Sequence, residues 1–447
     1  MAVIRPFKGL RPDPRVAHLV ASVPYDVVNR AEAAEAAKDN PISFLRVTRS
    51  EIELDKKTDV YSEEVYHKAN SNMQRLIEDA PLVSDADARF YIYRLIWKDV
   101  TQVGIAATFS VEDYNNDIIM KHEKTRRAKE DDRTNHIVTT NVQTGAVFLT
   151  YKGIDEVNEI VEKAINNNEP VYDFTTSDEV THTIWVMPKE ANDIIQFEID
   201  KSDHLYIADG HHRAASASRA QKVKMDENTS HTGDEEYNYF MAVLFPAEQL
   251  KILPYNRTVF ELNNLTDDDF IEKVKINFDV EDSETPSPTE KGKIGMFIDK
   301  KWYLLTPNKN VIPGEAVGDK LDVSLLQKFL LEPILNISDP RTDNNIDFVG
   351  GIRGTDELEK RVNSGASKVA FTLYPVSVDD LINISNAGET MPPKSTWFEP
   401  KLRDGLVVHT IRLCHCEPEL WVKQSLLDCH VVLNNGLLAM TNESRLF

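Results

Sequence analysis

Five consecutive residues bring an acid, two imidazoles and a guanidinium to one point of the chain: Asp209-Gly210-His211-His212-Arg213. An apolar run at 205–208 precedes them and predicts a buried strand, and the Ala- and Ser-rich stretch 214–220 is typical of a helix start. A strand, a tight turn and a helix in this order point backbone N–H groups and the positive end of the helix dipole at the turn. The spacing therefore predicts an anion-binding turn.

The side chains of this turn suit the same kind of ligand. Arg213 can donate two parallel hydrogen bonds to a phosphate, and His211 and His212 add further donors. Asp209 could hold a metal ion, orient a histidine or accept a proton. The alternative is an ordinary helix end whose polar side chains face water. So many reactive side chains in one strand-to-helix turn favour a functional site.

A second stretch, residues 121–136, contains six Lys or Arg and four Asp or Glu residues in a chain whose formal net charge is −22. If the stretch is helical, the spacing places His122 and Arg126 on one face. A solvated helix with many charge pairs is the usual explanation of such a mixed run. The local excess of positive charge favours a role in binding instead, with three candidate phosphate ligands: Lys121, Arg126 and Arg127.

Two more stretches could supply side chains to a ligand. Residues 1–29 are rich in proline, which excludes a helix interior, so the chain there is extended or turning. Asp26 lies in such a turn and either displays its carboxylate or caps a helix that starts near residue 30. Residues 391–401 are irregular and carry two lysines, Lys394 and Lys401, suited to a loop that faces a ligand.

Composition limits the classes of partner. The 447 residues suggest two or three domains, and 51 Lys and Arg against 73 Asp and Glu make the chain strongly acidic. A surface of this charge repels phosphate backbones and anionic membranes, so we expect neither nucleic acid nor membrane as a partner. The first residues form no apolar signal segment and no apolar run approaches about 18 residues, which predicts a cytoplasmic protein.

Three cysteines, all beyond residue 413, form no disulfide framework. Zinc ligands prefer two or more residues between paired cysteines, and Cys414-His415-Cys416 lacks that spacing. We therefore expect no metal site in this tail.

Expected helices and strands mix without a regular βαβα alternation, which favours an α+β fold with mixed sheets. Among the expected elements are a strand at 43–47, a helix at 59–77 and an antiparallel pair at 90–97 and 103–111. From residue 262 the character of the chain changes. We expect one domain at 1–261 with the turn, an α+β region at 262–405, and a tail at 406–447 of uncertain structure.

Four separated stretches resemble the family called domain of unknown function 1015 (DUF1015): residues 5–27, 121–123, 208–213 and 391–401. The resemblance extends from residue 1 to about 408. Its Gly-His-His-Arg element is similar to the phosphate-binding turn of the ParB/sulfiredoxin superfamily. That superfamily includes free-serine kinases, which phosphorylate serine from ADP or ATP. The resemblance implies a partly open, mixed-sheet core with the turn at a helix start.

For the site, the resemblance implies a nucleotide whose phosphates lie on Gly210, His212 and Arg213. It places Asp209, His211 and His212 in the catalytic machinery, with Mg²⁺ on Asp209. A separate carboxylate would act as base on the acceptor hydroxyl, and Glu123 and Asp26 are the two candidates.

Three hypotheses of function follow. The first is a phosphotransferase that uses ADP or ATP with Mg²⁺ on a small hydroxylated metabolite such as serine. The second is a nucleotide-binding regulator related to ParB clamps, without turnover of a small molecule. The third is a metal-dependent hydrolase with Asp209, His211 and His212 as ligands, although successive side chains diverge. The acceptor, the choice among ADP, ATP and CTP, and the oligomeric state stay open.

Overall fold

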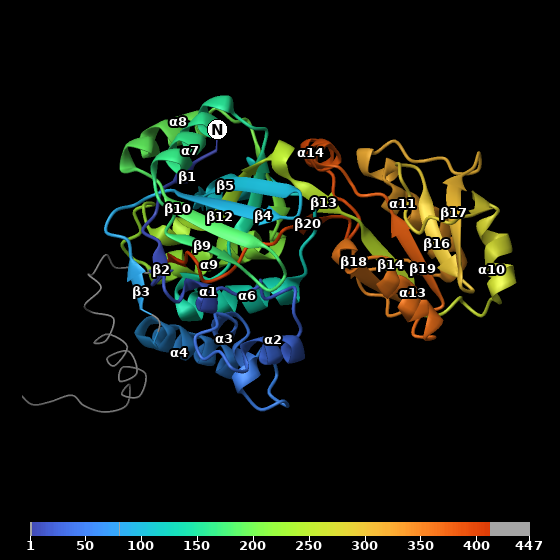
Figure 1. The fold of residues 1–447 in the computed structure, drawn as a ribbon, viewed down its shortest axis with the longest axis horizontal. Coiled ribbons are helices and arrows are strands. Elements are labelled where there is room, and N and C mark those ends of the chain that lie inside the picture. Colours follow the sequence, from blue (N-terminus) through green and yellow to red (C-terminus); the bar gives the residue numbers. More distant parts are fainter. Residues whose placement is uncertain (1, 80, 412–447) are drawn as a thin grey trace, which may run out of the picture. The chain divides into compact units, whose positions relative to one another are not determined.

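The computed structural model describes residues 2–79 and 81–411 (Figure 1). Within this part of the chain, nine strands join in one sheet. They are β1 (Ile4–Arg5), β4 (Tyr91–Trp97), β5 (Val100–Ser110), β6 (Ile119–Met120), β8 (Val147–Tyr151), β9 (Tyr172–Thr175), β10 (Thr181–Val186), β11 (Leu205–Asp209) and β12 (Tyr239–Pro246). Their order is β6-β11-β8-β12-β5-β4-β10-β9, with β1 paired to β5.

This sheet is mixed. The pairs β6–β11 and β8–β12 are parallel, and the other neighbours are antiparallel. The antiparallel pairing of β4 with β5 confirms the pair expected at 90–97 and 103–111. The protein is therefore mixed α/β, built on a mixed sheet as the sequence predicts.

Both faces of the sheet are buried. Successive side chains of a strand point to opposite faces, so Tyr91, Tyr93 and Leu95 of β4 pack on one side and Ile92 on the other. Helices cover the face of Ile92, and their apolar residues pack into the same cluster. These helices are α5 (Val111–Asn115), α7 (Asp155–Asn167), α8 (Asn192–Asp200) and α9 (His211–Glu227).

A group of helices, four from the N-terminal segment and one from further along the chain, packs beside the sheet (Figure 1). It consists of α1 (Ala17–Val20), α2 (Arg30–Ala37), α3 (Leu45–Thr48), α4 (Glu63–Asp79) and α6 (Arg127–Thr140), and α6 also contacts α9. The strand expected at 43–47 is wrong, because α3 occupies most of it and buries Leu45 and Val47. The packing of these two side chains in the fold outweighs the weak preference of a short apolar run for a strand. Asn29, not Asp26, caps α2.

A second sheet lies further along the chain. The described residues contribute six strands to it: β14 (Tyr255–Val259), β15 (Phe278–Asp282), β16 (Ile294–Ile298), β17 (Lys301–Pro307), β18 (Ile346–Gly350) and β19 (Val369–Leu373). They are ordered β15-β17-β16-β19-β14-β18. Its helices are α10 (Asp267–Val274), α11 (Asp322–Leu326), α12 (Glu332–Leu335), α13 (Asp356–Asn363) and α14 (Val378–Asn386).

The chain enters this second sheet before the expected boundary at residue 261, because β14 already pairs with β18 and β19. After α14 the chain returns to segments that precede the second sheet in sequence. There β20 (Trp397–Glu399) pairs with β13 (Lys251–Leu253), and β21 (His409–Thr410) pairs with β7 (Val142–Gln143). Residues 397–411 therefore pack with earlier segments of the chain. The division at 1–261 and 262–405 stays a proposal about folding units.

Short pairings complete the first half. The strands β2 (Leu10–Pro12) and β3 (Leu82–Ser84) form a two-stranded ladder. Isolated bridges join Leu10 to Val408 and Ser22 to Asp404. The second bridge brings Asp404 toward the N-terminal segment, although the two residues are far apart in sequence.

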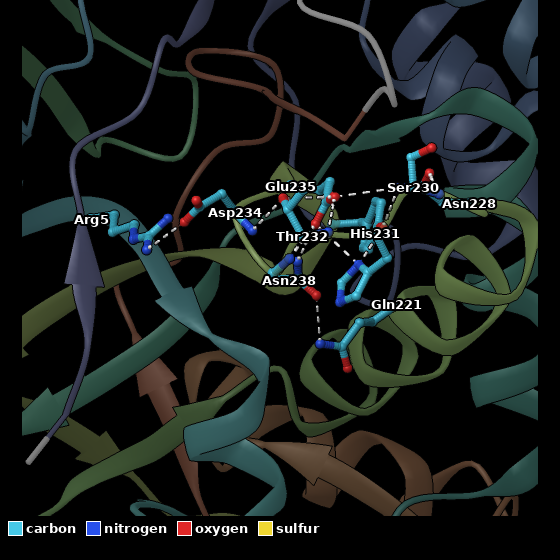
Figure 2. A network of polar contacts seen from close by, with 11 residues as sticks. Arg5, Gln221, Asn228, Ser230, His231, Thr232, Asp234, Glu235 and Asn238 are labelled. Carbon is cyan, nitrogen blue, oxygen red and sulfur yellow. Dashed lines mark hydrogen bonds and ion pairs between the residues drawn. The ribbon is translucent and has the colours of Figure 1, made fainter.

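A polar loop at 228–238 joins the end of α9 to β12 (Figure 2). The Glu235 carboxylate accepts hydrogen bonds from the backbone N–H groups of Thr232 (2.7 Å) and Gly233 (2.9 Å) and from the Asn238 amide (3.2 Å). Gln221 of α9 donates to Asn238 at 2.9 Å. These bonds hold the C-terminal half of the helix whose first residue is His211.

Among the described residues, no helix is long and apolar enough to cross a membrane. The cysteine tail, for which we expect no metal site, lies outside the described residues.

Candidate functional site

The predicted strand, turn and helix at 205–220 are confirmed as β11, Gly210 and α9. The pairing of β11 with β8 shifts between Ile207 and Asp209, which marks a bulge next to the turn. Gly210 has φ of +95°, and a Cβ added there would lie 2.9 Å from Nε of Arg213. The turn therefore requires glycine for both its left-handed backbone and its close packing.

The N-terminus of α9 has no side-chain cap. The first helical hydrogen bond runs from the N–H of Ala214 to the carbonyl of Gly210 at 3.1 Å. The N–H groups of residues 211–213 have no acceptor in the part of the chain that the structure describes. This arrangement leaves donors at the positive end of a helix, which favours a bound anion.

Arg213 lies beneath the turn and is 9% exposed. Its Nη1 donates to the carbonyl of Ala146, and its Nε has no hydrogen-bond partner among the described residues. Burial by itself lowers the pKa of the guanidinium, but the carboxylates of Asp26, Asp209 and Asp404 outweigh burial and raise it. Arg213 is thus a buried positive charge whose Nε has no hydrogen-bond partner among the described residues.

Asp209 forms an ion pair with Lys401, whose Nζ lies 2.8 Å from Oδ2. Burial disfavours the charged carboxylate, but Lys401 and Arg213 together hold the pKa of Asp209 well below its usual range. Asp209 is therefore a carboxylate whose charge is already balanced. It is a poor proton acceptor near neutral pH.

The two histidines of the turn both contact residues 122–126, which we call the strap. Nε2 of His211 accepts the backbone N–H of His122 at 3.4 Å, and Nε2 of His212 accepts that of Arg126 at 3.0 Å. The rings of His122 and His211 meet edge to face with centroids 4.4 Å apart. Burial lowers the pKa of both turn histidines, so each is neutral with Nε2 as an acceptor.

The stretch 121–136, in which a shared face for His122 and Arg126 required a helix, is helical only in part. Helix α6 begins only at Arg127, and Arg126 has an extended backbone. His122 and Arg126 therefore do not share a helix face. Their backbone N–H groups bond to the turn histidines instead, which sequence spacing could not reveal because the partners lie 89 and 86 residues away.

Both candidate bases lie near the turn. Burial raises the pKa of the Glu123 carboxyl, Lys394 opposes this, and the nearby charge of Asp209 raises it further. Asp26 is exposed, and its charge acts on His212 and Arg213. The environment of Glu123 suits a general base, because burial moves the pKa of its carboxyl upward, toward neutral pH.

The three cations proposed as phosphate ligands differ in their surroundings. Nζ of Lys121 bonds to the carbonyl of Tyr114 (2.8 Å) and to Asp117 (2.7 Å), away from the turn residues. Arg126 donates to the carbonyl of Arg341 at 2.9 Å. The exposed side chain of Arg127 makes no hydrogen bond or ion pair with the described residues. Of these three side chains, that of Arg126 lies close enough for its charge to act on His212 and Glu123, whereas Lys121 and Arg127 make no contact with the turn residues among the described residues.

Two lysines also lie at the turn. Lys401 pairs with Asp209, and Lys394 lies close enough to Glu123 and Asp26 for their charges to raise its pKa against the effect of burial. Both lysines come from the 391–401 stretch. Its proline and lysine content was the only sequence signal for them, and it carried no information about which turn they face.

The residues do not fit a metal centre of the protein's own. Within the described ranges, no group of three or more His, Cys, Asp or Glu side chains could hold a metal ion. Nε2 of each turn histidine already accepts a backbone N–H, and Asp209 is paired with Lys401. We therefore derive no step through Mg²⁺.

Fold and site together define a mixed-sheet protein whose Asp-Gly-His-His-Arg turn opens a helix without a side-chain cap. The chain belongs to the family described as "Protein of unknown function (DUF1015)", whose profile matches residues 4–324. The match includes the turn and the strap. It ends before the 391–401 stretch, whereas the resemblance was expected to reach about residue 408. No curated protein matches the chain.

Several solved structures resemble this one. A conserved hypothetical protein from Pyrococcus furiosus is 12% identical, with a TM-score of 0.34 over 67% of this chain and 94% of its own. A free serine kinase in complex with AMP is 10% identical, with a TM-score of 0.35 over 66% and 86%. C-terminally truncated SbnI from Staphylococcus aureus is 12% identical, with a TM-score of 0.38 over 73% and 97%. These TM-scores are below 0.5, so the likenesses carry no functional argument.

Proposed function

We propose that this protein is a nucleotide-dependent phosphotransferase that acts on a small hydroxylated metabolite. The observation that carries the proposal is an uncapped helix N-terminus surrounded by Arg213, Lys401 and Lys394, with the raised-pKa carboxyl of Glu123 beside it. Phosphoryl transfer needs mainly charge neutralisation and alignment, and these groups supply both.

Each group has a role in this proposal. The N–H groups of residues 211–213 fit the oxygens of a phosphate, and the buried positive charge of Arg213 beneath the turn adds to the attraction. Lys394 would neutralise further negative charge, and Lys401 keeps Asp209 ionised and fixed. His211 and His212 hold the strap, and with it Glu123, next to the phosphate position.

A nucleoside di- or triphosphate would supply the phosphoryl group. In the transfer, the acceptor hydroxyl oxygen forms a bond to the terminal phosphorus, and the bond from that phosphorus to its bridging oxygen breaks. Glu123 takes the hydroxyl proton. The products are a phosphate monoester and a nucleotide shortened by one phosphate.

We also propose that the core belongs to the ParB/sulfiredoxin superfamily. The support is the Asp-Gly-His-His-Arg turn between β11 and α9. A nucleotide-binding regulator without turnover would use the same turn, and the neutral histidines with occupied Nε2 atoms suit binding as well as catalysis. A measurement of phosphate transfer distinguishes the phosphotransferase from the regulator.

A thermal-shift experiment tests the nucleotide site. ADP, ATP and CTP, each with and without Mg²⁺, are added to the wild type, to Lys394→Met and to the control Lys309→Ala, which is exposed in a loop after β17. A hundredfold excess of nucleotide over its Kd should raise the Tm of the wild type and the control by about 3 °C, and that of Lys394→Met by less. Arg213 is left intact because it also bonds to the carbonyl of Ala146. No shift with any nucleotide would refute the site.

Turnover tests the chemistry. Glu123→Gln should lower the rate of phosphate transfer by roughly 10²–10⁴-fold and leave the nucleotide-induced shift in place, because a base contributes to the chemical step. Asp26→Asn serves as the comparison. If Asp26→Asn shows the larger loss, Asp26 is the base. If the nucleotide binds but no acceptor is phosphorylated, the protein is a regulator.

A further inference from the structure

A cavity of about 680 Å³ lies next to the site and shares Glu123 with it. Its walls come from the strap and from three later segments, near residues 316–324, 338–341 and 388–393. A cavity of this size accommodates a small metabolite. Of its lining residues, Glu123 has a role in the proposed function, and the rest of the cavity has none assigned above.

Hydrogen bonds tie the cavity walls to the strap. The backbone N–H of Met391 donates to the carbonyl of His122 at 2.8 Å. The Arg126 guanidinium donates to the carbonyl of Arg341 at 2.9 Å. Because the strap is also bonded to His211 and His212, the cavity and the turn at 209–213 share one hydrogen-bonded segment.

Several charged groups of the lining are already satisfied. Glu389 accepts the backbone N–H groups of Val317 (3.2 Å) and Gly318 (2.9 Å). Asp339 and Arg341 neutralise each other through two hydrogen bonds of 2.9 and 2.8 Å. These groups shape the cavity, and the Asp339–Arg341 pair adds no net charge to it.

The groups left for a ligand are mainly acidic. The side chains of Glu123 and Asp319 form no hydrogen bond or ion pair with other described residues. Lys124 is a cation of the lining, and the charges of Lys394 and Arg126 act on Glu123 from beside it, so Asp319 is the carboxylate left for a cationic ligand. With the carboxylate of Glu389, the lining carries a net negative charge. Two hydroxyl side chains, Ser338 and Thr390, add neutral polar groups.

We propose that this cavity binds the acceptor of the phosphotransferase and that the acceptor is a small cationic alcohol, a molecule with an ammonium group and a hydroxyl group. The proposal rests on the proposed function. Asp319 attracts the ammonium group, and the hydroxyl lies toward Glu123, which takes its proton as the oxygen forms the new bond to phosphorus. A substrate with an unpaired carboxylate is disfavoured by Asp319 and Glu389.

Calorimetric titration of the full chain tests the class of ligand. The probes are ethanolamine, glycerol, glycerate and serine, which are cationic, neutral, anionic and zwitterionic alcohols. Ethanolamine should bind most tightly to the wild type. Asp319→Asn should weaken it by about tenfold, Lys124→Gln should strengthen it, and the control Asp226→Asn, exposed on α9, should leave it unchanged.

Tighter binding of glycerate, glycerol or serine than of ethanolamine overturns the proposed class. If Asp319→Asn and Lys124→Gln bind ethanolamine as tightly as the wild type does, the proposed binding position in this cavity is wrong. The nucleotide thermal shift is measured on the same preparations, which keeps the two proposals apart. A nucleotide response without ethanolamine binding refutes only this inference. Ethanolamine binding without any nucleotide response refutes the phosphotransferase and the acceptor role with it.

Discussion

Burial changes the pKa of single carboxyl groups near the turn, and Asp404 is an example. It is 4% exposed and lies beside the position of a Cβ at Gly145, with Arg213 near enough to act on its charge. Burial raises the pKa of the Asp404 carboxyl from 3.8 to about 7, although Arg213 opposes the shift. The folded protein therefore keeps a proton on Asp404 that the unfolded chain loses near pH 4.

This difference predicts how stability depends on pH. Between about pH 4 and pH 7 the folded state binds one more proton at Asp404 than the unfolded state, so this group lowers the free energy of unfolding as the pH rises. Asp404→Asn removes the effect. Urea unfolding at pH 5 and pH 7 should show the variant gaining stability relative to the wild type at the higher pH.

The control for this prediction is Asp226→Asn, whose side chain is exposed. Its stability relative to the wild type should be the same at both pH values. If Asp404→Asn behaves like this control, the Asp404 carboxyl has no raised pKa.

The strap is the element that joins the parts of the site. It connects the turn histidines on one side with the cavity walls at Met391 and Arg341 on the other. A short segment held by backbone hydrogen bonds at both ends can keep a carboxylate such as Glu123 in place without a regular helix or strand.

Hydrogen exchange tests the strap. In His212→Ala the backbone N–H of Arg126 loses its acceptor, so its amide should exchange about fivefold faster, in line with the loss of about 1 kcal/mol from one hydrogen bond. The matched control is His67→Ala on α4, where the histidine is exposed. Equal exchange of the strap in both variants would show that His212 does not hold it.

At the scale of the whole molecule, the net charge of −22 opposes long-range attraction to nucleic acid. The positive groups that the structure brings to the turn are partly neutralised, because Lys401 pairs with Asp209 and Lys394 lies near the carboxyl groups of Glu123 and Asp26. A small phosphate ligand therefore fits such a site better than the phosphate backbone of a nucleic acid does.

This balance predicts weak binding to duplex DNA. Fluorescence anisotropy with a labelled duplex should show no saturable binding at micromolar protein and about 0.15 M salt, because few phosphates could be neutralised. Tight binding that weakens steeply with added salt would contradict the prediction and favour a ParB-like regulator that uses DNA.

The sequence by itself determined the local features. The strand, turn and helix at 205–220, the helix expected at 59–77 (α4) and the antiparallel pair β4–β5 follow from periodicity and turn residues, which act over a few positions. The sequence also indicated the turn as the centre of the site, since its residue types need no distant partner to suggest an anion.

Only the tertiary structure decided which side chains meet at that turn. Lys401 and Asp209 lie 192 residues apart, and the strap reaches the turn histidines across more than 80 residues. Long-range pairing also decides that helix α6 begins only after Arg126. It likewise brings residues 397–411 back to pair with β13 and β7. Such contacts form because burial and backbone hydrogen bonding are satisfied over the whole fold, and no local pattern encodes them.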